Sequence, residues 1–356
     1  MIPIFLLEGE CVVDGVGSFS KTKKIRENLI KSNAKVLEYE IASIKDGWQK
    51  PLPKNRLRCA CSPMIAILEA QKLFNNRDAD ALVIHGKDHI KSDFRDKKEE
   101  RNKLMHLYGE NGHILQAYNK LAHEFIKYWN ISQEEFRSLS DALFQNHLRV
   151  WLKNDHSQKR PDKKWFDLVT SFFRGVDCAN PSVDFEGCVV FATKEATQKY
   201  NLSQNVNIQV SACQVEQCCE DNMEDIPKIA PYRHLKIAFE QACKQANMDF
   251  ISNFLSRKAF LEVYTCYPVV PMGFLLATGM VSSPKEIPKF LEEYPLTITG
   301  GLNLSKAAYN NTTLSAFASM ANKLRENKNI IIGGIHSVGA VGYKQAFAIL
   351  EKVVAK

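Results

Sequence analysis

Long apolar runs are missing from this sequence. A membrane-spanning helix needs about 18 or more apolar residues in succession, and no stretch of the chain approaches that length. The opening residues, MIPIFLLE, have no basic start and too short an apolar run for a secretory signal peptide. We therefore expect a cytoplasmic protein without membrane insertion.

Cysteines are present, but the patterns that would give them a structural role are absent. The 10 cysteines are scattered, several lie within apolar runs, and no export signal accompanies them. Reduced thiols are therefore favoured over a disulfide framework. The densest group, Cys213 with Cys218 and Cys219, lacks the second pair or the nearby histidines of a zinc site. The sequence predicts no metal site.

A strongly basic composition is also missing, since the net charge is only +7 over 356 residues. The positive charge is concentrated in residues 87–103 and 153–164. Each run could be a solvated surface, or could contact a polyanionic small molecule or a nucleic acid. Because neither run has interleaved aromatic residues or a known nucleic-acid-binding motif, we expect no nucleic acid partner.

What the chain does contain is an alternation of strand and helix patterns. Residues 2–7, 34–41 and 81–84 have the pattern of strands, and residues 21–31 and 64–74 that of helices. From residue 115 to 152 the pattern is helical, and residues 132–135 fit a capping box at the start of a helix. Strand and helix patterns alternate again after residue 206. The sequence predicts an α/β fold.

Residues 261–314 join two apparent strand ends that could share one site. LEVYTCYP has the pattern of a buried strand that stops at its proline, and PLTITGG repeats the arrangement with a glycine pair that permits a sharp bend. Open α/β sheets bind ligands at the carboxyl ends of their strands. The residues at these two ends are Tyr264, Cys266, Tyr267, Gly300 and Gly301.

Two cysteines precede the helix expected over residues 64–74. The positive end of a helix dipole and its unpaired amides favour a thiolate. Cys59 or Cys61 could therefore be a nucleophile, and the alternative is a buried structural cysteine. Ser62 and Pro63 fit the cap and the first residue of this helix.

In these segments the chain resembles the thiolase superfamily, in particular the sterol-carrier-protein-type thiolases and the bacterial acetyl-CoA acetyltransferase-like proteins. Tyr264-Thr265-Cys266-Tyr267 stands where those proteins have H-D-C-F. GGLNLSKAA, which begins at Gly300, stands where they have G-G-x-x-x-x-G-H-P. A thiolase-like branch of the family ends the second motif in a pair of asparagines, matched here by Asn310 and Asn311.

The resemblance implies a thiolase-like fold, with two fused βαβαβαββ halves in a layered αβαβα arrangement and a helical loop domain inserted in the first half. On this basis we expect residues 1–90 and 176–220 to form the N-terminal half, 91–175 the inserted domain, and 221–356 the C-terminal half. The insertion covers the CoA-binding cleft in the family, and Gln145-Asn146-His147 resembles its K-N-H. His147, Lys159 and Arg160 would accordingly contact coenzyme A.

The resemblance also implies acyl-CoA chemistry, in which a cysteine accepts the acyl group with the help of a histidine, a second cysteine and an oxyanion site. Cys61 falls at or within one residue of the acyl-accepting position, with Cys59 as the near competitor. The family histidines are replaced by Ala307 and Tyr264. The second cysteine, of a C-x-G motif, is replaced by Ser337 before Gly339.

Other residues could restore part of this chemistry. His336 could act as a base if its loop turns it inward, although neighbours on a strand face opposite sides. Asn310 or Asn311 could bind a carbonyl oxygen. The expected catalytic residues are Cys61, Tyr264, Cys266, Asn311, His336 and Ser337, and the expected substrate contacts are Cys59, Gly300, Gly301, Asn310, Gly339, His147, Lys159 and Arg160.

We therefore predict an atypical acyl-CoA acyltransferase of lipid metabolism, with coenzyme A or acyl-CoA as substrate or ligand and no tightly bound cofactor. Alternatives are a catalytically inactive acyl-CoA-binding subunit of a larger acyltransferase complex, or a transferase or hydrolase that uses Cys61 with another base. By analogy with the family, we expect a homodimer.

Overall fold

The computed structural model describes the chain apart from residues 1, 111, 155–159, 203–205 and 355–356. It is a mixed α/β fold built on one ten-stranded sheet, so the expected fold class is confirmed. In spatial order the strands are β4 (Arg56–Leu57), β3 (Val36–Ile41), β5 (Ala81–His89), β6 (Asp184–Thr193), β1 (Ile4–Val13), β7 (Val206–Gln217), β10 (Lys344–Val354), β9 (Ile332–Gly339) and β8 (Ala259–Glu262), with β2 (Val16–Gly17) paired to β1.

The sheet contains two halves whose strand orders are reversed about its centre. In the first half β3 and β5 are parallel, while β6 is antiparallel to both β5 and β1. In the second half β8 and β9 are parallel, while β10 is antiparallel to both β9 and β7. The first strands of the two halves, β1 and β7, pair at the centre. Each half therefore has three strand pairings of the same kind.

Two helices accompany the strands of each half. They are α1 (Ser20–Lys31) and α2 (Ser62–Asn75) in the first half, and α9 (Arg233–Ala246) and α14 (Thr312–Glu326) in the second. Both halves thus follow the order β-α-β-α-β-β. The domain limits expected from the sequence stay predictions, and the strand order itself places β7 with the second half.

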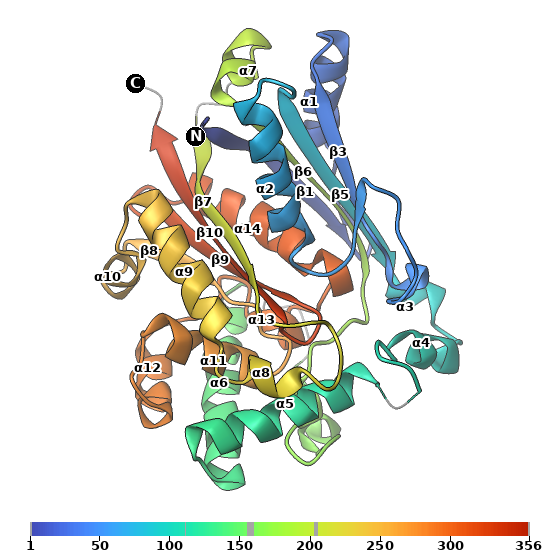
Figure 1. Ribbon diagram of the computed structural model, residues 1–356, viewed down its shortest axis with the longest axis vertical. Coiled ribbons are helices and arrows are strands. Elements are labelled where there is room, and N and C mark those ends of the chain that lie inside the picture. The colour runs from blue at the N-terminus through green and yellow to red at the C-terminus, as the bar shows by residue number, and fades with distance from the viewer. Residues whose placement is uncertain (1, 111, 155–159, 203–205, 355–356) are drawn as a thin grey trace.

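Helices cover both faces of the sheet, which explains why β6 and β9 are buried along nearly their whole length. Helices α2 and α14 share one face, where Met64 and Phe74 join Phe317 and Leu324 in one core with strand residues of both halves. The opposite face is covered by α1 and α7 (Lys194–Lys199) over the first half, and by α9 over the second (Figure 1). We call α2 and α14 the two central helices, and 7 of the 14 residues of α2 and 9 of the 15 residues of α14 are buried.

Between β5 and β6 the chain forms a helical segment beyond the lower end of the sheet in Figure 1. Ser132 and Glu135 exchange hydrogen bonds of 3.0 and 2.6 Å at the start of α6, so the expected capping box is confirmed. The segment consists of α3 (Ile90–Asp93), α4 (Lys98–Leu104), α5 (Ile114–Trp129), α6 (Gln133–Asn154), η2 (Lys163–Phe166) and η3 (Gly175–Asp177).

Shorter elements of the second half connect its strands and its two long helices, and several of them pack against the helical segment. They are α8 (Ile226–Ile229), α10 (Phe250–Leu255), α11 (Val269–Thr278), η4 (Pro284–Glu286), α12 (Ile287–Glu293), α13 (Gly301–Leu304) and η5 (Tyr309–Asn311), while η1 (Ile44–Asp46) belongs to the first half. Helices α8 and α11 contact α5, and α12 contacts α6. Within the described residues, no helix has the length and apolar character needed to cross a bilayer.

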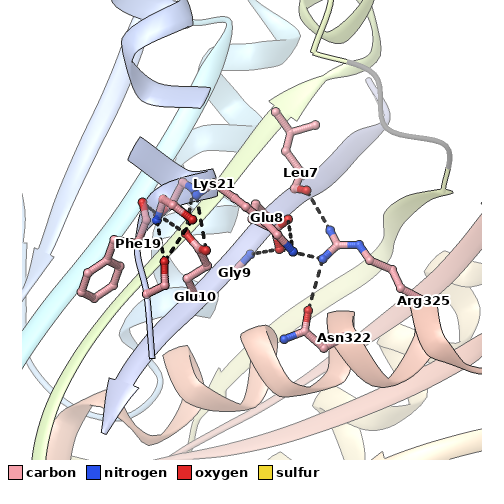
Figure 2. Close-up of polar contacts among 11 residues, drawn as sticks. Leu7, Glu8, Gly9, Glu10, Phe19, Lys21, Asn322 and Arg325 are labelled. Carbon is pink, nitrogen blue, oxygen red and sulfur yellow. Dashed lines mark hydrogen bonds and ion pairs between the residues drawn. The ribbon is translucent and has the colours of Figure 1, made fainter. Parts of the chain in front are cut away.

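A buried ion pair joins α14 to the central strand β1 (Figure 2). The Glu8 side chain is buried, and Nη1 of Arg325 lies 2.8 Å from its carboxylate while Nη2 donates to the Leu7 carbonyl. At the next residue, a Cβ on Gly9 would lie 2.8 Å from the Cα of Ala318, so α14 approaches the strand too closely for any side chain there. The glycine and the ion pair together fix α14 on β1.

Candidate functional site

A narrow cavity of about 90 Å³ lies where the two central helices begin. Cys59 and Ala60 line it from the turn before α2, and Tyr309 and Asn310 from the turn before α14. The chain after β8, the turn after β9 and the helical segment complete its wall with Tyr264, Cys266, Tyr267, Val338, Ala340, Met105, Leu107, Ile114 and Tyr118. The cavity therefore lies at the junction of both halves and the helical segment.

Cys59 occupies a strained turn between a strand and a helix. Its φ is +100°, a region that residues with a side chain rarely adopt. It follows β4 and precedes α2, and its carbonyl accepts hydrogen bonds from the hydroxyl and the amide of Ser62 at 2.6 and 3.1 Å. A strained residue in a turn from strand to helix is the geometry that presents a nucleophile in other enzymes.

The surroundings of Cys59 favour its thiolate. Hydrogen bonding by the Cys61 thiol lowers the pKa of Cys59 below its ordinary value, and the Lys344 ammonium acts in the same direction while burial opposes both. Burial raises the pKa of Cys61 well above its ordinary value. The residues that line the cavity include Cys59 and not Cys61. The geometry therefore favours Cys59, the competitor in the sequence argument, as the reactive thiol.

Ser337 lies behind the two thiols. It is fully buried, its hydroxyl is 2.6 Å from that of Thr313, and it also hydrogen-bonds to Cys61. Gly339, two residues further along β9, adjoins the reactive thiol, because a Cβ there would lie 3.6 Å from Cys59 Sγ. Gly339 therefore lies beside the Cys59 thiol, and Ser337 is linked to that thiol through its hydrogen bond to Cys61.

The end of β8 lies at the cavity, as the sequence predicts. Tyr264 and Cys266 line the cavity together with Ala307, which stands at the family histidine position. Burial raises the pKa of the Tyr264 hydroxyl and of the Cys266 thiol above their ordinary values, so both are neutral at neutral pH. The Tyr264 hydroxyl can therefore donate a hydrogen bond and is a poor base.

The second strand end expected from PLTITGG is not a strand. Residues 295–299 are irregular, because the buried Glu262 carboxylate takes the amides that a strand would give to a neighbour. Its Oε2 accepts from Ile298 N at 2.7 Å and from Thr299 N at 3.2 Å, and its Oε1 accepts from the Thr299 hydroxyl. This carboxylate therefore holds the loop that leads to the glycine pair.

The glycine pair packs against α6 and is not among the cavity-lining residues. A Cβ on Gly300 would lie 2.6 Å from the Cβ of Trp151, and one on Gly301 would lie 3.1 Å from the His147 ring. Both glycines have positive φ. Burial lowers the pKa of His147 to about 4, so it is a neutral core residue. The structure brings neither the glycines nor His147 to Cys59.

The two asparagines differ in place. Asn310 lines the cavity, and its amide donates to the Ala42 carbonyl at 2.9 Å. Asn311 is fully buried outside the cavity and donates to the Asp88 carboxylate at 2.9 Å. A Cβ on Gly86 would lie 1.9 Å from the Asn311 Oδ1, so this side chain is packed directly on strand β5. Asn311 therefore holds the start of α14.

His336 faces the side of β9 opposite to Ser337, as alternation along a strand requires. Its Nε2 lies 2.7 Å from Gln345 Oε1, and its ring centroid lies 4.8 Å from that of Phe274. Burial lowers the pKa of His336 to about 4. The structure thus does not bring this histidine to the cavity as a base.

An open groove of about 1150 Å³ adjoins the narrow cavity. The two spaces share Met105, Ile114, Ala179, Pro181 and Tyr267 in their walls, so one leads into the other. Basic side chains gather along the groove, with Glu99 as an acidic neighbour. They are Lys91, Lys98, Arg101, Lys103 and Lys306.

The charge of the groove comes mainly from the first basic run of the sequence. Lys98, Arg101 and Lys103 belong to α4, whereas Lys91 and Lys306 pair with Asp14 at 3.1 and 2.7 Å. The second run was expected to contact coenzyme A through Lys159 and Arg160. Arg160 is exposed and is not among the groove-lining residues, and Lys159 lies outside the described residues.

The sequence argument missed several cavity residues, among them Tyr309 and Trp48. Tyr309 has a φ of +46° and lines the cavity opposite the α2 turn, but nothing in the sequence marks its conformation. Trp48 covers the cavity from a loop, where a large aromatic residue among glycine and proline was the available signal. In the described part of the chain, no three His, Cys, Asp or Glu side chains are grouped to hold a metal ion.

No protein-family model and no curated protein sequence matches this chain. Solved structures match it over nearly its whole length. A monomeric SCP2-thiolase like protein type 1 from Mycobacterium smegmatis has a TM-score of 0.66 at 14% identity, over 98% of this chain and 77% of that one. Human mitochondrial 3-ketoacyl-CoA thiolase has a TM-score of 0.66 at 12% identity, over 99% of both chains.

The same human enzyme in complex with CoA has a TM-score of 0.67 at 12% identity, over 99% of this chain and 98% of that one. At such identities the likeness concerns the fold alone. The chain therefore has the thiolase-like fold that the sequence resemblance implied.

Proposed function

We propose that the protein binds an acyl thioester of coenzyme A and accepts the acyl group on Cys59. The observation that carries this proposal is the strained Cys59 at the start of α2, which lines a narrow cavity that leads into a basic groove. A reactive thiol at a closed end and cations at an open end suit a thioester whose carrier is rich in phosphate. A thiolase of similar fold has been solved with CoA.

The first chemical step would be attack of the Cys59 thiolate on the thioester carbonyl carbon. A bond forms between Sγ and that carbon, the carbon–sulfur bond to coenzyme A breaks, and the coenzyme A thiolate leaves and takes a proton from solvent. The Tyr264 hydroxyl lines the same cavity and is a hydrogen-bond donor for the developing oxyanion. Cys61, by hydrogen bonding, positions and stabilises the attacking thiolate.

Condensation with a second acyl group is not part of the proposal. It requires a general base to remove a carbon-bound proton, and loss of such a base typically costs about 10²–10⁴ in rate. The described residues that line the cavity include no histidine and no carboxylate. Transfer of the acyl group to another acceptor, or its hydrolysis, demands less of the site and is the reaction class we favour.

The second candidate is an acyl-CoA-binding subunit without turnover. The same lack of a base in the described cavity wall favours it. A homodimer and an association with a partner acyltransferase subunit both stay predictions, and one protein of similar fold is described as monomeric. Analytical ultracentrifugation at several concentrations distinguishes a monomer from a dimer.

The test is intact-protein mass spectrometry after incubation with acetyl-CoA. We expect the wild type to gain one acetyl group, Cys59→Ala to gain none, and Cys61→Ala to gain it more slowly. Cys213→Ala is the matched control, because Cys213 is a buried thiol of the same core that is absent from the cavity wall. An adduct that persists in Cys59→Ala contradicts the assignment. Measurable CoA binding without any adduct favours the binding subunit.

A further inference from the structure

We propose that the cavity beside Cys59 admits an acetyl-sized acyl group and excludes longer and carboxylated ones. This inference rests on the proposed acyl-thioester function and names its substrate class. The cavity measures about 90 Å³. At about 30 Å³ for a water-sized group, it holds about three heavy atoms. An acetyl group has that number: a methyl carbon, a carbonyl carbon and an oxygen.

The aromatic walls of the cavity are held at their far ends. The Trp48 Nε1 donates to the Asp221 carboxylate at 2.7 Å. The Tyr118 hydroxyl donates to the Ala340 carbonyl at 2.7 Å, and its ring stacks on Tyr267 with the centroids 4.1 Å apart. Because a swing of either ring would break a partly buried hydrogen bond, the cavity does not enlarge by simple side-chain rotation.

A third wall is Tyr309, which packs against the buried cluster of Ile44, Ile90 and Phe94. Its φ of +46° fixes the backbone that carries the ring. Like Trp48 and Tyr118, it lines the cavity and does not line the basic groove. A longer acyl chain would therefore have to displace packed aromatic side chains, and overpacking of this kind is costly.

The chemistry of the wall also selects against a charged acyl group. Met105, Leu107, Ile114 and Val338 give it an apolar surface, and its described residues include no lysine, arginine or histidine. Lys344 acts on Cys59 but is not among the lining residues, so a carboxylate placed there would lose its hydration without a direct cationic partner in the described wall, which is unfavourable. Malonyl and succinyl thioesters are excluded on this ground even where their length would be tolerated.

Trp48 is the wall that can be removed with the least damage to the fold. It is half-buried on the loop that follows η1 and packs on the edge of the core around α2, whereas Tyr118 is fully buried within its core. Asp221, its hydrogen-bond partner, keeps a second hydrogen bond from the Tyr108 hydroxyl at 2.6 Å. Trp48→Ala therefore opens the cavity from the surface side.

The experiment measures rates of adduct formation by mass spectrometry with acetyl-, butyryl-, octanoyl- and malonyl-CoA. We expect the wild type to react at least about tenfold faster with acetyl- than with octanoyl-CoA, since one poorly fitted methylene is worth about 10–200-fold. Trp48→Ala should lower the ratio of the acetyl rate to the octanoyl rate at least about tenfold. The matched control is Trp129→Ala, a half-buried tryptophan of α5 outside the cavity wall, which should behave as wild type.

A second readout separates the size limit from the proposed function. Iodoacetamide and its N-octyl derivative alkylate a thiol without any acyl transfer. If no acyl-CoA reacts but iodoacetamide modifies Cys59 much faster than the N-octyl reagent, the size limit stands and the proposed function fails. If octanoyl-CoA, or the N-octyl reagent, reacts with the wild type as fast as its small counterpart, the size limit is overturned. An unchanged preference in Trp48→Ala overturns the role of Trp48.

Discussion

The two central helices begin in the same way although their sequences are unrelated. Before α2 stand Cys59, Ala60 and Cys61, and before α14 stand Tyr309, Asn310 and Asn311. In each triplet the first residue has positive φ and lines the cavity, and the third caps the helix. The repeated fold thus supplies two equivalent turns that face one space.

What differs between the two turns is their chemistry. At α2, Cys61 hydrogen-bonds to the thiol of Cys59, so the buried capping residue acts on the residue at the cavity. At α14, Asn311 hydrogen-bonds away from the cavity, to Asp88 on strand β5. Under the proposed function, the turn before α2 serves reactivity, whereas the turn before α14 holds its helix on the sheet.

The support that α14 gives depends on its ion pair with strand β1. Arg325→Met removes the 2.8 Å ion pair with the Glu8 carboxylate and the hydrogen bond to the Leu7 carbonyl. We expect the free energy of unfolding to fall by about 3–5 kcal/mol, measured by urea denaturation. The control is Lys21→Met, because Lys21 lies 3.9 Å from Glu8 and its side chain is 69% exposed. Similar losses in the two variants would contradict a specific role for Arg325.

The start of α14 depends on the close approach of Asn311 to strand β5. In Gly86→Ala the new Cβ would lie 1.9 Å from the Asn311 Oδ1, so the capping residue must move. We expect a loss of about 2–3 kcal/mol in unfolding free energy. In an Asn311→Ala background the same glycine substitution should cost much less, because the clashing group is gone. Equal costs in both backgrounds would place the effect elsewhere.

The carboxyl group that receives Asn311 makes stability depend on pH. Burial raises the pKa of Asp88 from 3.8 to about 7, so the native state keeps this proton when the unfolded state has lost it. The contribution to stability is full below pH 3.8 and is lost as the pH rises to about 7. Between pH 5 and pH 8, the unfolding free energy of Asp88→Asn should fall by about 1–3 kcal/mol less than that of the wild type.

The control for this pH dependence is Glu262, whose pKa burial raises to about 7. The part of the pH-dependent loss of stability that comes from Glu262 should persist in Asp88→Asn. The slope of unfolding free energy against pH should therefore become shallower but not reach zero. The urea midpoints of the wild type and of Asp88→Asn, taken at four pH values between 5 and 8, measure the two slopes. An unchanged slope in Asp88→Asn would show that Asp88 titrates as an ordinary carboxyl group.

Backbone strain at the two turns sharpens the comparison further. At a φ of +100° or +46°, a Cβ is unfavourable and glycine is tolerated. We expect Cys59→Gly to be more stable than Cys59→Ala by about 1 kcal/mol, and Tyr309→Gly to exceed Tyr309→Ala by a similar amount. The difference between glycine and alanine at one site isolates the strain from the lost side chain. Identical stabilities at position 59 would show that its turn carries no strain.

The sequence was sufficient for the fold class and for one wall of the site. The buried pattern of LEVYTCYP placed Tyr264 and Cys266 at a strand end, and both line the cavity. Alternation along a strand correctly separated His336 from Ser337, because that rule is local. Whether His336 or Ser337 points toward the central helices depends on how α14 and α9 pack on the sheet. No local sequence pattern specifies that packing.

Other assignments depended on backbone geometry that the sequence does not encode locally. Cys59 and Cys61 both precede α2, and the left-handed turn alone decides that Cys59 reaches the cavity. PLTITGG does not form the predicted strand because the Glu262 carboxylate, more than 30 residues earlier in the chain, accepts hydrogen bonds from the amides of Ile298 and Thr299. No local sequence pattern identifies Tyr309, because its conformation is imposed by tertiary packing. Of the expected residues, Cys59, Tyr264, Cys266 and Asn310 line the cavity, and the chemical roles assigned to them stay predictions.

The ion pair between Glu8 and Arg325 also has a consequence for the order in which the chain can fold. The two residues are 317 positions apart. At about 5–20 residues per second, translation separates them by some tens of seconds. During that time the central strand of the first half carries a carboxylate whose burial awaits an arginine not yet made. The first half therefore completes its packing only after α14 emerges, as one late and slow event dominated by long-range contacts.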